Sequence, residues 1–406
     1  MPEQLTTREL RARNRSRVLR ELVLSQESTR AGLALALALS PATITNVLAD
    51  LEAEGLVEDR GSVPSDGGRP IVKVGIRAGG AYVLGADVGE KGVAVELFDL
   101  AMTRVDREFR DAATRGANPA EIATALQAAV DAILGRNTAI RDRVVGLGLG
   151  LPGIVEDAGG SHAGHGVVLY AQSLGWPAVH LDELVDVPGL QVLADNGAKA
   201  LAAAEIWFGS VRGVDDAVVA LLGRGVGLGL VSSGRLLRGA RSSAGEWGHT
   251  KIAADGRVCR CGGRGCLEAH VGSDALIAAW RERGGEPDGS GWRALDALVA
   301  AADRGDAAAV AVVDEALGTL ALSLANLVNL TNPQKVVIGG WVGLRLMRSR
   351  RDELEARIRE ASLQRPGSQF ELELCQFEGD SVALGAALLP LEKLIETPVV
   401  AVSSRA

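Results

Sequence analysis

The sequence predicts an α/β protein in which an N-terminal winged helix-turn-helix precedes two lobes of the actin-like ATPase (ribonuclease H-like) type. Three observations predict this fold class. The first part of the chain carries three short helical patterns followed by two strand patterns. From Tyr82 onward, apolar strands that end in glycine turns alternate with amphipathic helices, in two cycles of similar order. A loop rich in glycine, with a histidine and three cysteines, lies within the second cycle.

The length and charge of the chain predict its domains and one class of partner. A chain of 406 residues is longer than a single hydrophobic core accommodates. We therefore expect a winged domain over 1–77, a first lobe over 78–195 and a second lobe over 196–406, with a C-terminal helix able to return to the first lobe. The net charge is −8, but residues 1–77 carry +1 and the remainder −9. A basic end on an acidic body favours nucleic acid as the partner of the N-terminal part.

The composition excludes other classes of protein. The arginine-rich start lacks the apolar stretch of a signal peptide. The longest apolar run, Ala31 to Leu39, is far shorter than the roughly 18 residues of a membrane span. Four cysteines, three of them close together, do not resemble a secreted disulfide framework. We therefore expect a cytoplasmic protein that contacts no membrane.

The winged domain is predicted from its helix boundaries. A helix over 13–24 is followed by a second from an N-cap at Thr29 to Leu37, and Ala38 or a residue near it must then make a turn where glycine is usual. Ser40-Pro41 is an N-cap with a first-turn proline, and 56–59 can pair with 71–76 as a hairpin. The alternative is a small helical subdomain with a solvated arginine face. The residues expected to contact double-stranded DNA are Ser40, Thr43, Thr45 and Asn46 on the third helix, and Arg69 in the wing.

The segment 248–270 predicts a metal site. One imidazole and three thiolates suit tetrahedral zinc, and glycines between the cysteines let the loop return to the same ion. Four protein ligands imply a closed, structural site with one zinc per chain. The alternative is a set of unrelated buried thiols. The expected ligands are His249, Cys259, Cys261 and Cys266.

These motifs resemble the ROK family (repressors, open reading frames and kinases) over nearly the whole chain. AGEWGH (244–249) followed by CRCGGRGCLE (259–268) is similar to the family's most specific signature. LGLPG (149–153) and SLGW (173–176) resemble two further family segments, and the winged helix resembles the N-acetylglucosamine- and xylose-type repressors. The resemblance implies a sugar pocket, in which His249 also ligates zinc. For Glu246 and Glu268 the alternative is that they are ordinary surface carboxylates. The implied sugar-binding residues are Asn196, Glu246, His249 and Glu268.

The segments that hold ATP in the family's kinases are altered here. Glu90 stands where a glycine is usual and brings negative charge toward the phosphates. In GRGVGLG (223–229), Arg224 replaces a threonine, and Leu228 replaces a glycine and is expected to crowd the backbone. Trp341 follows the glycine pair at the adenosine end. The resemblance therefore implies no bound ATP.

The catalytic base of those kinases is the aspartate of E-N-D-A-N, which resembles residues 195–199. A gapless register set by Glu205 places Gly197 at the base position and Lys199 at the last asparagine, where it is expected to neutralise a nearby acid. Glycine accepts no proton. A register slipped by two residues would instead make Asp195 the base.

Three functions follow, of which the first is preferred. The chain is expected to be a sugar-responsive DNA-binding repressor of carbohydrate genes, active as a homodimer or homotetramer, with a sugar or sugar phosphate bound between the lobes. The second is an ATP-dependent sugar kinase with an appended DNA-binding domain, which needs Asp195 as its base. In the third, the zinc loop itself binds DNA. The acidic charge of the body disfavours this function.

Overall fold

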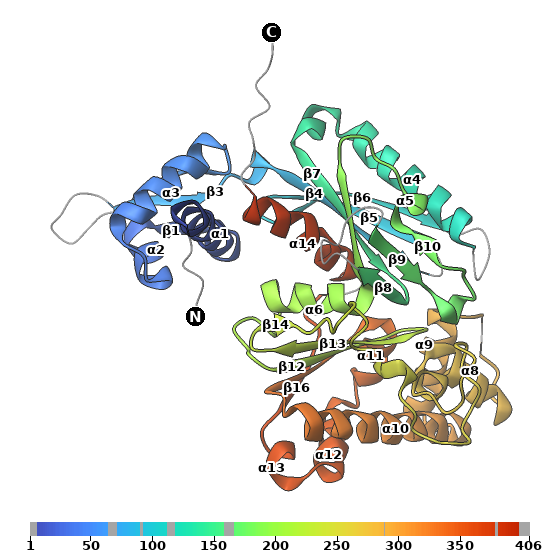
Figure 1. Ribbon diagram of the computed structural model, residues 1–406. Coiled ribbons are helices and arrows are strands. Elements are labelled where there is room, and N and C mark those ends of the chain that lie inside the picture. Colours follow the sequence, from blue (N-terminus) through green and yellow to red (C-terminus); the bar gives the residue numbers. More distant parts are fainter. Residues whose placement is uncertain are drawn as a thin grey trace.

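The computed structural model describes residues 6–63, 71–89, 92–111, 118–157, 166–287, 289–377 and 381–397. Figure 1 shows an N-terminal unit, in blue, beside an upper lobe in cyan and green, with a second lobe below it. The last helix, in dark red, lies in the upper part of the molecule next to the first helix. The two ends of the described chain therefore meet.

The N-terminal unit contains the three helices and the hairpin that the sequence predicts. The first helix begins six residues earlier than expected, at a capping box between Thr6 and Glu9. Ala38 adopts the left-handed conformation (φ 49°) between the second and third helices, so alanine makes the turn. A short strand that the sequence did not indicate pairs with the hairpin. The elements are α1 (Thr7–Ser25), β1 (Glu27–Thr29), α2 (Arg30–Leu37), α3 (Pro41–Ala53), β2 (Val57–Val63) and β3 (Ile71–Ile76).

Each lobe is built on a five-stranded sheet, and the two sheets have the same topology. The strand orders are β6-β5-β4-β7-β11 in the first lobe and β14-β13-β12-β15-β16 in the second. In both, a three-stranded antiparallel meander is extended by two parallel strands. This duplication is the relation that the two cycles in the sequence predicted.

The first lobe carries an additional small sheet, β10-β9-β8, that the sequence did not indicate. The elements of the first lobe, and the helix that follows it, are β4 (Tyr82–Gly89), β5 (Gly92–Asp99), β6 (Arg104–Asp111), α4 (Pro119–Arg136), β7 (Val144–Leu151), β8 (Ile154–Asp157), β9 (Val167–Tyr170), β10 (Val179–His180), α5 (Leu181–Leu184), β11 (Gln191–Asn196) and α6 (Gly197–Phe208).

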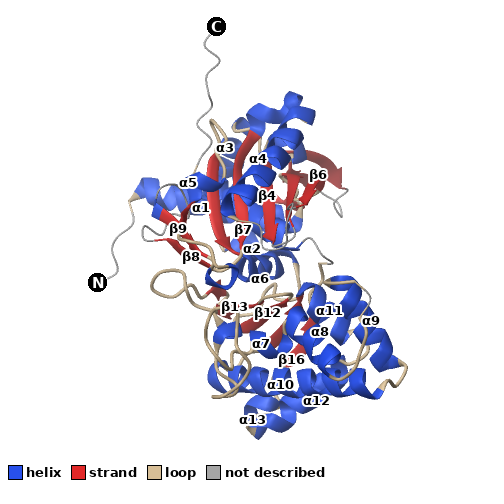
Figure 2. Cartoon of the chain, turned by 90° about the vertical axis from the view of Figure 1, so that its right-hand side faces the viewer, coloured by secondary structure: helices blue, strands red, loops and turns tan. Residues whose placement is uncertain are grey.

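Helices gather on the second lobe, as Figure 2 shows below α6. The longest, α10, is the single helix in the described part of the chain that is long and apolar enough to cross a membrane, and it packs here against α9 and α12. The lobe comprises β12 (Ala217–Leu222), β13 (Val226–Ser232), β14 (Arg235–Leu236), α7 (Glu268–Val271), α8 (Ser273–Glu282), α9 (Trp292–Asp303), α10 (Ala307–Thr331), β15 (Lys335–Gly339), α11 (Gly340–Met347), α12 (Arg351–Ala361), α13 (Gln364–Gly367) and β16 (Glu371–Leu374). The last helix, α14 (Ser381–Glu396), returns to the first lobe.

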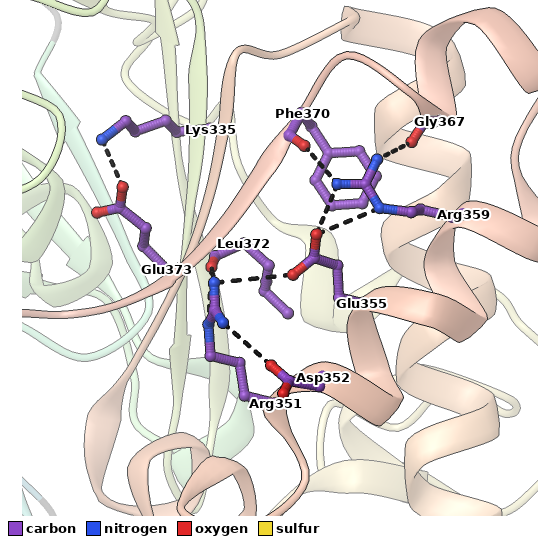
Figure 3. A network of polar contacts seen from close by, with 9 residues as sticks. All are labelled: Lys335, Arg351, Asp352, Glu355, Arg359, Gly367, Phe370, Leu372 and Glu373. Carbon is purple, nitrogen blue, oxygen red and sulfur yellow. Dashed lines mark hydrogen bonds and ion pairs between the residues drawn. The ribbon is translucent and has the colours of Figure 1, made fainter.

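Arginines of α12 hold the edge strand of the second sheet. Arg351 Nε donates to the Leu372 carbonyl at 2.9 Å, and Arg359 Nη2 donates to the Phe370 carbonyl at 2.9 Å (Figure 3). Arg359 is itself held by Glu355, one helical turn away. The strand β16 is only four residues long and lies at the edge of its sheet, and the arginines bind the carbonyl of Leu372 within it and of Phe370 just before it.

Two helices pack on the sheets at glycines. A Cβ added at Gly85 or Gly148 would lie about 2 Å from a backbone oxygen of α14, so α14 rests directly on β4 and β7 of the first lobe. A Cβ added at Gly229 would lie 2.3 Å from Ala202 Cβ, so α6 rests equally closely on β13 of the second lobe. The glycine-rich strands of the sequence thus serve helix packing.

We expect Gly148→Ala to lower the free energy of unfolding by about 3 kcal/mol or more, because its Cβ would lie 1.8 Å from the Ala386 oxygen. Gly135→Ala, in the exposed part of α4 with no atom within 4 Å, is the matched control and should raise it by about 0.5–1 kcal/mol. Urea unfolding of both variants checks this; equal stability of the two would contradict the packing of α14.

Candidate sugar and metal site

Three cysteines and one histidine form a compact cluster in the second lobe. The ligand atoms of His249, Cys259, Cys261 and Cys266 all lie within 4.8 Å of one another. The Cys261 and Cys266 sulfurs are 3.7 Å apart, close to the roughly 3.8 Å that two thiolates reach on one tetrahedral zinc. The structure therefore brings together all four predicted ligands, and the cluster could hold a metal ion.

The loop around the cluster depends on its glycines and on a contact with the first lobe. Gly265 has φ 68°, and a Cβ there would lie 1.6 Å from the Ala253 carbonyl oxygen, so no other residue fits. Gln172 Nε2 of the first lobe donates to the Cys261 carbonyl at 2.8 Å. Lys251 Nζ lies 2.8 Å from Cys266 Sγ, and this hydrogen bond raises the pKa of Lys251.

The two ring nitrogens of His249 face different partners. Nδ1 lies 3.8 Å from Cys259 Sγ, on the side of the cluster. Nε2 lies 3.5 Å from the Ser173 hydroxyl, in the SLGW segment of the first lobe. One nitrogen is thus available to a metal while the other points toward the opposite lobe, the arrangement by which a ligating histidine can also orient a second group. Ser173 was not among the residues singled out from the sequence.

The two predicted sugar-binding glutamates lie near His249. Burial raises the pKa of Glu246, while the charges of His249 and Lys199 lower it. Glu268 is 6% exposed and is already engaged: its Oε2 accepts from the Val226 amide at 3.1 Å, and Arg260 lies 3.4 Å from its Oε1. Glu268 thus fixes the start of β13, and a carboxylate retains further lone pairs for a ligand.

Asn196 is placed where β11 ends and α6 begins. Its Oδ1 accepts from the Ala198 amide at 2.8 Å, which caps the helix, and its Nδ2 donates to the Gly153 carbonyl at 2.7 Å. The side chain therefore joins the helix to the turn of LGLPG. Gly197 follows at the first helical position, and a Cβ there would lie 3.6 Å from its nearest neighbour, Val382 Cγ1. A Cβ would thus fit at this position in ordinary van der Waals contact.

Asp195 is buried and paired with an arginine. It is 2% exposed, forms an ion pair with Arg238, and accepts from the Asn196 amide at 2.8 Å. Lys199 Nζ donates to the Ser242 carbonyl, and burial lowers the pKa of Lys199. The charges of Asp195 and Glu246 both act on Lys199, so its role in neutralising a nearby acid stays a prediction, while Arg238 forms the direct ion pair with Asp195.

Comparison with known proteins decides the family. The sequence profile of the ROK family matches residues 83–393. The chain belongs to the ROK family. Over 397 residues it is 27% identical to the xylose repressor of Caldicellulosiruptor bescii, covering 95% of this chain and 97% of that one.

Two solved ROK structures show how much of the fold is shared. A ROK family transcriptional regulator, a homologue of the Escherichia coli MLC protein, has a TM-score of 0.78 and 26% identity, and covers 96% of this chain and 98% of its own. A ROK glucokinase of Streptomyces griseus, solved with glucose and AMPPNP, has a TM-score of 0.64 and 26% identity, covering 76% of this chain and 99% of its own. The match to the regulator spans nearly the whole chain, whereas the match to the kinase leaves about a quarter of it uncovered.

The residues predicted to alter the nucleotide segments make contacts within the protein. Arg224 Nε pairs with Asp274 at 2.6 Å, and the Trp341 indole nitrogen would lie 3.3 Å from a Cβ at Gly223. Leu228 is 2% exposed in the core of the second lobe, so it packs inward rather than crowding the loop as we expected. Glu90 lies outside the described residues.

The residues expected to contact DNA lie at the start of α3. The Ser40 hydroxyl accepts from the Thr43 amide at 3.1 Å and lies 2.9 Å from the Thr43 hydroxyl, so both side chains serve the cap. Thr45 and Asn46 are exposed on the helix surface. Arg69 lies outside the described residues, so its place in the wing stays a prediction.

Replacement of one cluster cysteine should release the metal. We expect Cys266→Ser to weaken metal affinity by at least about 10-fold and to lower the unfolding midpoint, because thiolate ligation is coupled to folding of the loop. Cys375→Ser, at a buried cysteine outside the cluster, is the control and should keep its metal. Elemental analysis and thermal unfolding of both variants provide the measurement; full metal content in Cys266→Ser would count against the cluster.

The raised pKa of Glu246 predicts a pH-dependent stability. A carboxyl whose folded pKa exceeds its unfolded value of 4.5 destabilises the folded state once the pH rises above that value, and costs nothing below it. Glu246→Gln should therefore gain stability over wild type as the pH rises from 4.5 to about 7.5, while losing sugar affinity. Thermal unfolding across this range checks the sign; an advantage that shrinks with rising pH would contradict it.

Proposed function

We propose that this chain is a sugar-responsive DNA-binding transcriptional repressor that has kept the ROK sugar site and lost kinase chemistry. The observation that carries the proposal is the conjunction of a winged unit with a ROK body in which a glycine, Gly197, follows the capping Asn196. The repressor and regulator similarities reported above support it, since they extend over the N-terminal unit. The resulting partners are a double-stranded operator and a sugar or sugar phosphate.

We propose zinc as the metal and assign it a structural role. A His-Cys₃ donor set is typical of zinc, and four protein ligands leave no open position for a reacting water. When bound, the ion would supply the cross-link that holds the loop, and His249 would turn its second nitrogen to a sugar hydroxyl. Glu246, Glu268 and Asn196 are proposed as further acceptors or donors for sugar hydroxyls. We likewise propose domain limits near 77 and 195, a cytoplasmic location and a homo-oligomeric state.

The kinase function remains the second candidate, because ROK kinases share the body. It requires Asp195 as general base, yet Asp195 is buried in an ion pair with Arg238. ATP-dependent phosphorylation of D-glucose, D-xylose or N-acetyl-D-glucosamine that Asp195→Asn abolishes would favour the kinase. If the protein phosphorylates a sugar and also binds a DNA fragment from its own promoter region, it has both activities.

The proposal is tested with the full chain and a DNA fragment from its own promoter region. A mobility shift that changes when D-glucose, D-xylose or N-acetyl-D-glucosamine is added supports a sugar-responsive regulator. The absence of any shift, with and without the sugars, overturns the proposal.

Asn46 should contribute to operator recognition. We expect Asn46→Ala to weaken operator binding by about 10-fold, since one well-placed base contact is worth about 1–3 kcal/mol. Asn326→Ala, an exposed helical asparagine on α10 of the second lobe, is the matched control and should leave binding unchanged. Titration of labelled operator gives both affinities; equal affinities of the two variants would remove α3 from the interface.

A further inference from the structure

Two helices run side by side from the candidate sugar site to the winged unit. α6 follows the last strand of the first lobe, and α14 is the last helix of the described chain. Three contacts relate them at the same sequence separation of 185, so the helices are parallel and in register over their length. The three contacts are Gly197 with Val382, Ala200 with Gly385 and Trp207 with Glu392.

The contact in the middle of the pair makes it stiff. A Cβ at Gly385 would lie 1.8 Å from the Ala200 carbonyl oxygen, so the two backbones touch without intervening side chains. Close-packed backbones of this kind move as one body rather than slide. A displacement at one end of the pair is therefore carried to the other end.

The N-terminal ends of both helices belong to the candidate site. Asn196 caps α6 and holds the turn at Gly153, while Lys199 is bonded to the Ser242 carbonyl in the loop that leads to Glu246. Val382, in the first turn of α14, is the nearest neighbour of the Cβ position at Gly197. A ligand that reorders these groups moves the start of both helices.

The C-terminal ends of both helices are held by α1 of the winged unit. The Arg20 guanidinium lies 4.3 Å from the centre of the Trp207 ring, and the Trp207 indole nitrogen donates to Glu392 Oε1 at 3.2 Å. Arg15, 4% exposed, donates to the Ile395 carbonyl at 2.8 Å and so caps the end of α14. Figure 1 shows α1 lying beside α14.

We infer that α6 and α14 form a rigid strut that transmits sugar binding to the winged unit, and that Arg20 and Trp207 are the positioning residues at its DNA-binding end. The inference rests on the proposed function and adds to it the route of regulation. Neither residue touches the sugar or the DNA in this scheme. Their replacement therefore uncouples the two ligands without removing either site.

The test measures coupling, the ratio of operator dissociation constants with and without saturating sugar, for the full chain with D-glucose, D-xylose or N-acetyl-D-glucosamine. In wild type we expect a ratio of about 5-fold or more for one of the three. Arg20→Met should bring the ratio to within about 2-fold of unity with unchanged sugar affinity, and Trp207→Phe should lower it in the same direction. Arg20→Lys, which keeps the cation, should retain part of the coupling.

The controls separate this inference from the proposed function. Arg13→Met removes one exposed arginine from the same helix and should leave the ratio at its wild-type value. Wild-type coupling in Arg20→Met overturns the strut while leaving the repressor intact, and so does a loss of sugar affinity in that variant. A ratio of unity in wild type with all three sugars overturns sugar-responsive repression and the strut together.

Discussion

The close approach of helix backbone to sheet and to helix is the constraint on which the molecule depends. α14 rests on the first lobe at Gly85 and Gly148, and α6 rests on the second at Gly229. At each of these positions a single methyl group would meet backbone or side-chain atoms at about 2 Å. The glycine-rich strands thus permit two helices to lie between the lobes, where side chains of ordinary size would hold them apart.

That packing also fixes the site, because the site is assembled from the ends of the packed elements. Asn196 ends a strand, caps a helix and holds the turn at Gly153. The metal cluster is approached from the first lobe by Gln172 and Ser173. A ligand bound here would contact groups from both lobes, which is the geometry that lets binding energy be converted into a change of lobe orientation.

A ROK regulator and a ROK kinase share this scaffold, and the proposed loss of kinase chemistry involves few side chains. Gly197 offers no proton acceptor, although a Cβ at this position would make ordinary van der Waals contacts. The neighbouring Asp195 is buried and forms an ion pair with Arg238. In the segments predicted to differ from the kinases, Arg224 pairs with Asp274 and Trp341 lies against Gly223.

The sequence by itself determined the elements whose signals are local. The sequence predicted the caps at Thr29 and Ser40, the paired cycles and the four metal ligands. Capping, periodicity and ligand type depend on residues that lie close together in the sequence. Only the tertiary structure decided the partners of charged and core groups. Arg238 reaches Asp195 across 43 positions, and Leu228 turns into a core rather than toward a loop. The meeting of α1 with α6 and α14 likewise joins segments from opposite ends of the chain, and no local pattern encodes which distant surface a side chain will meet.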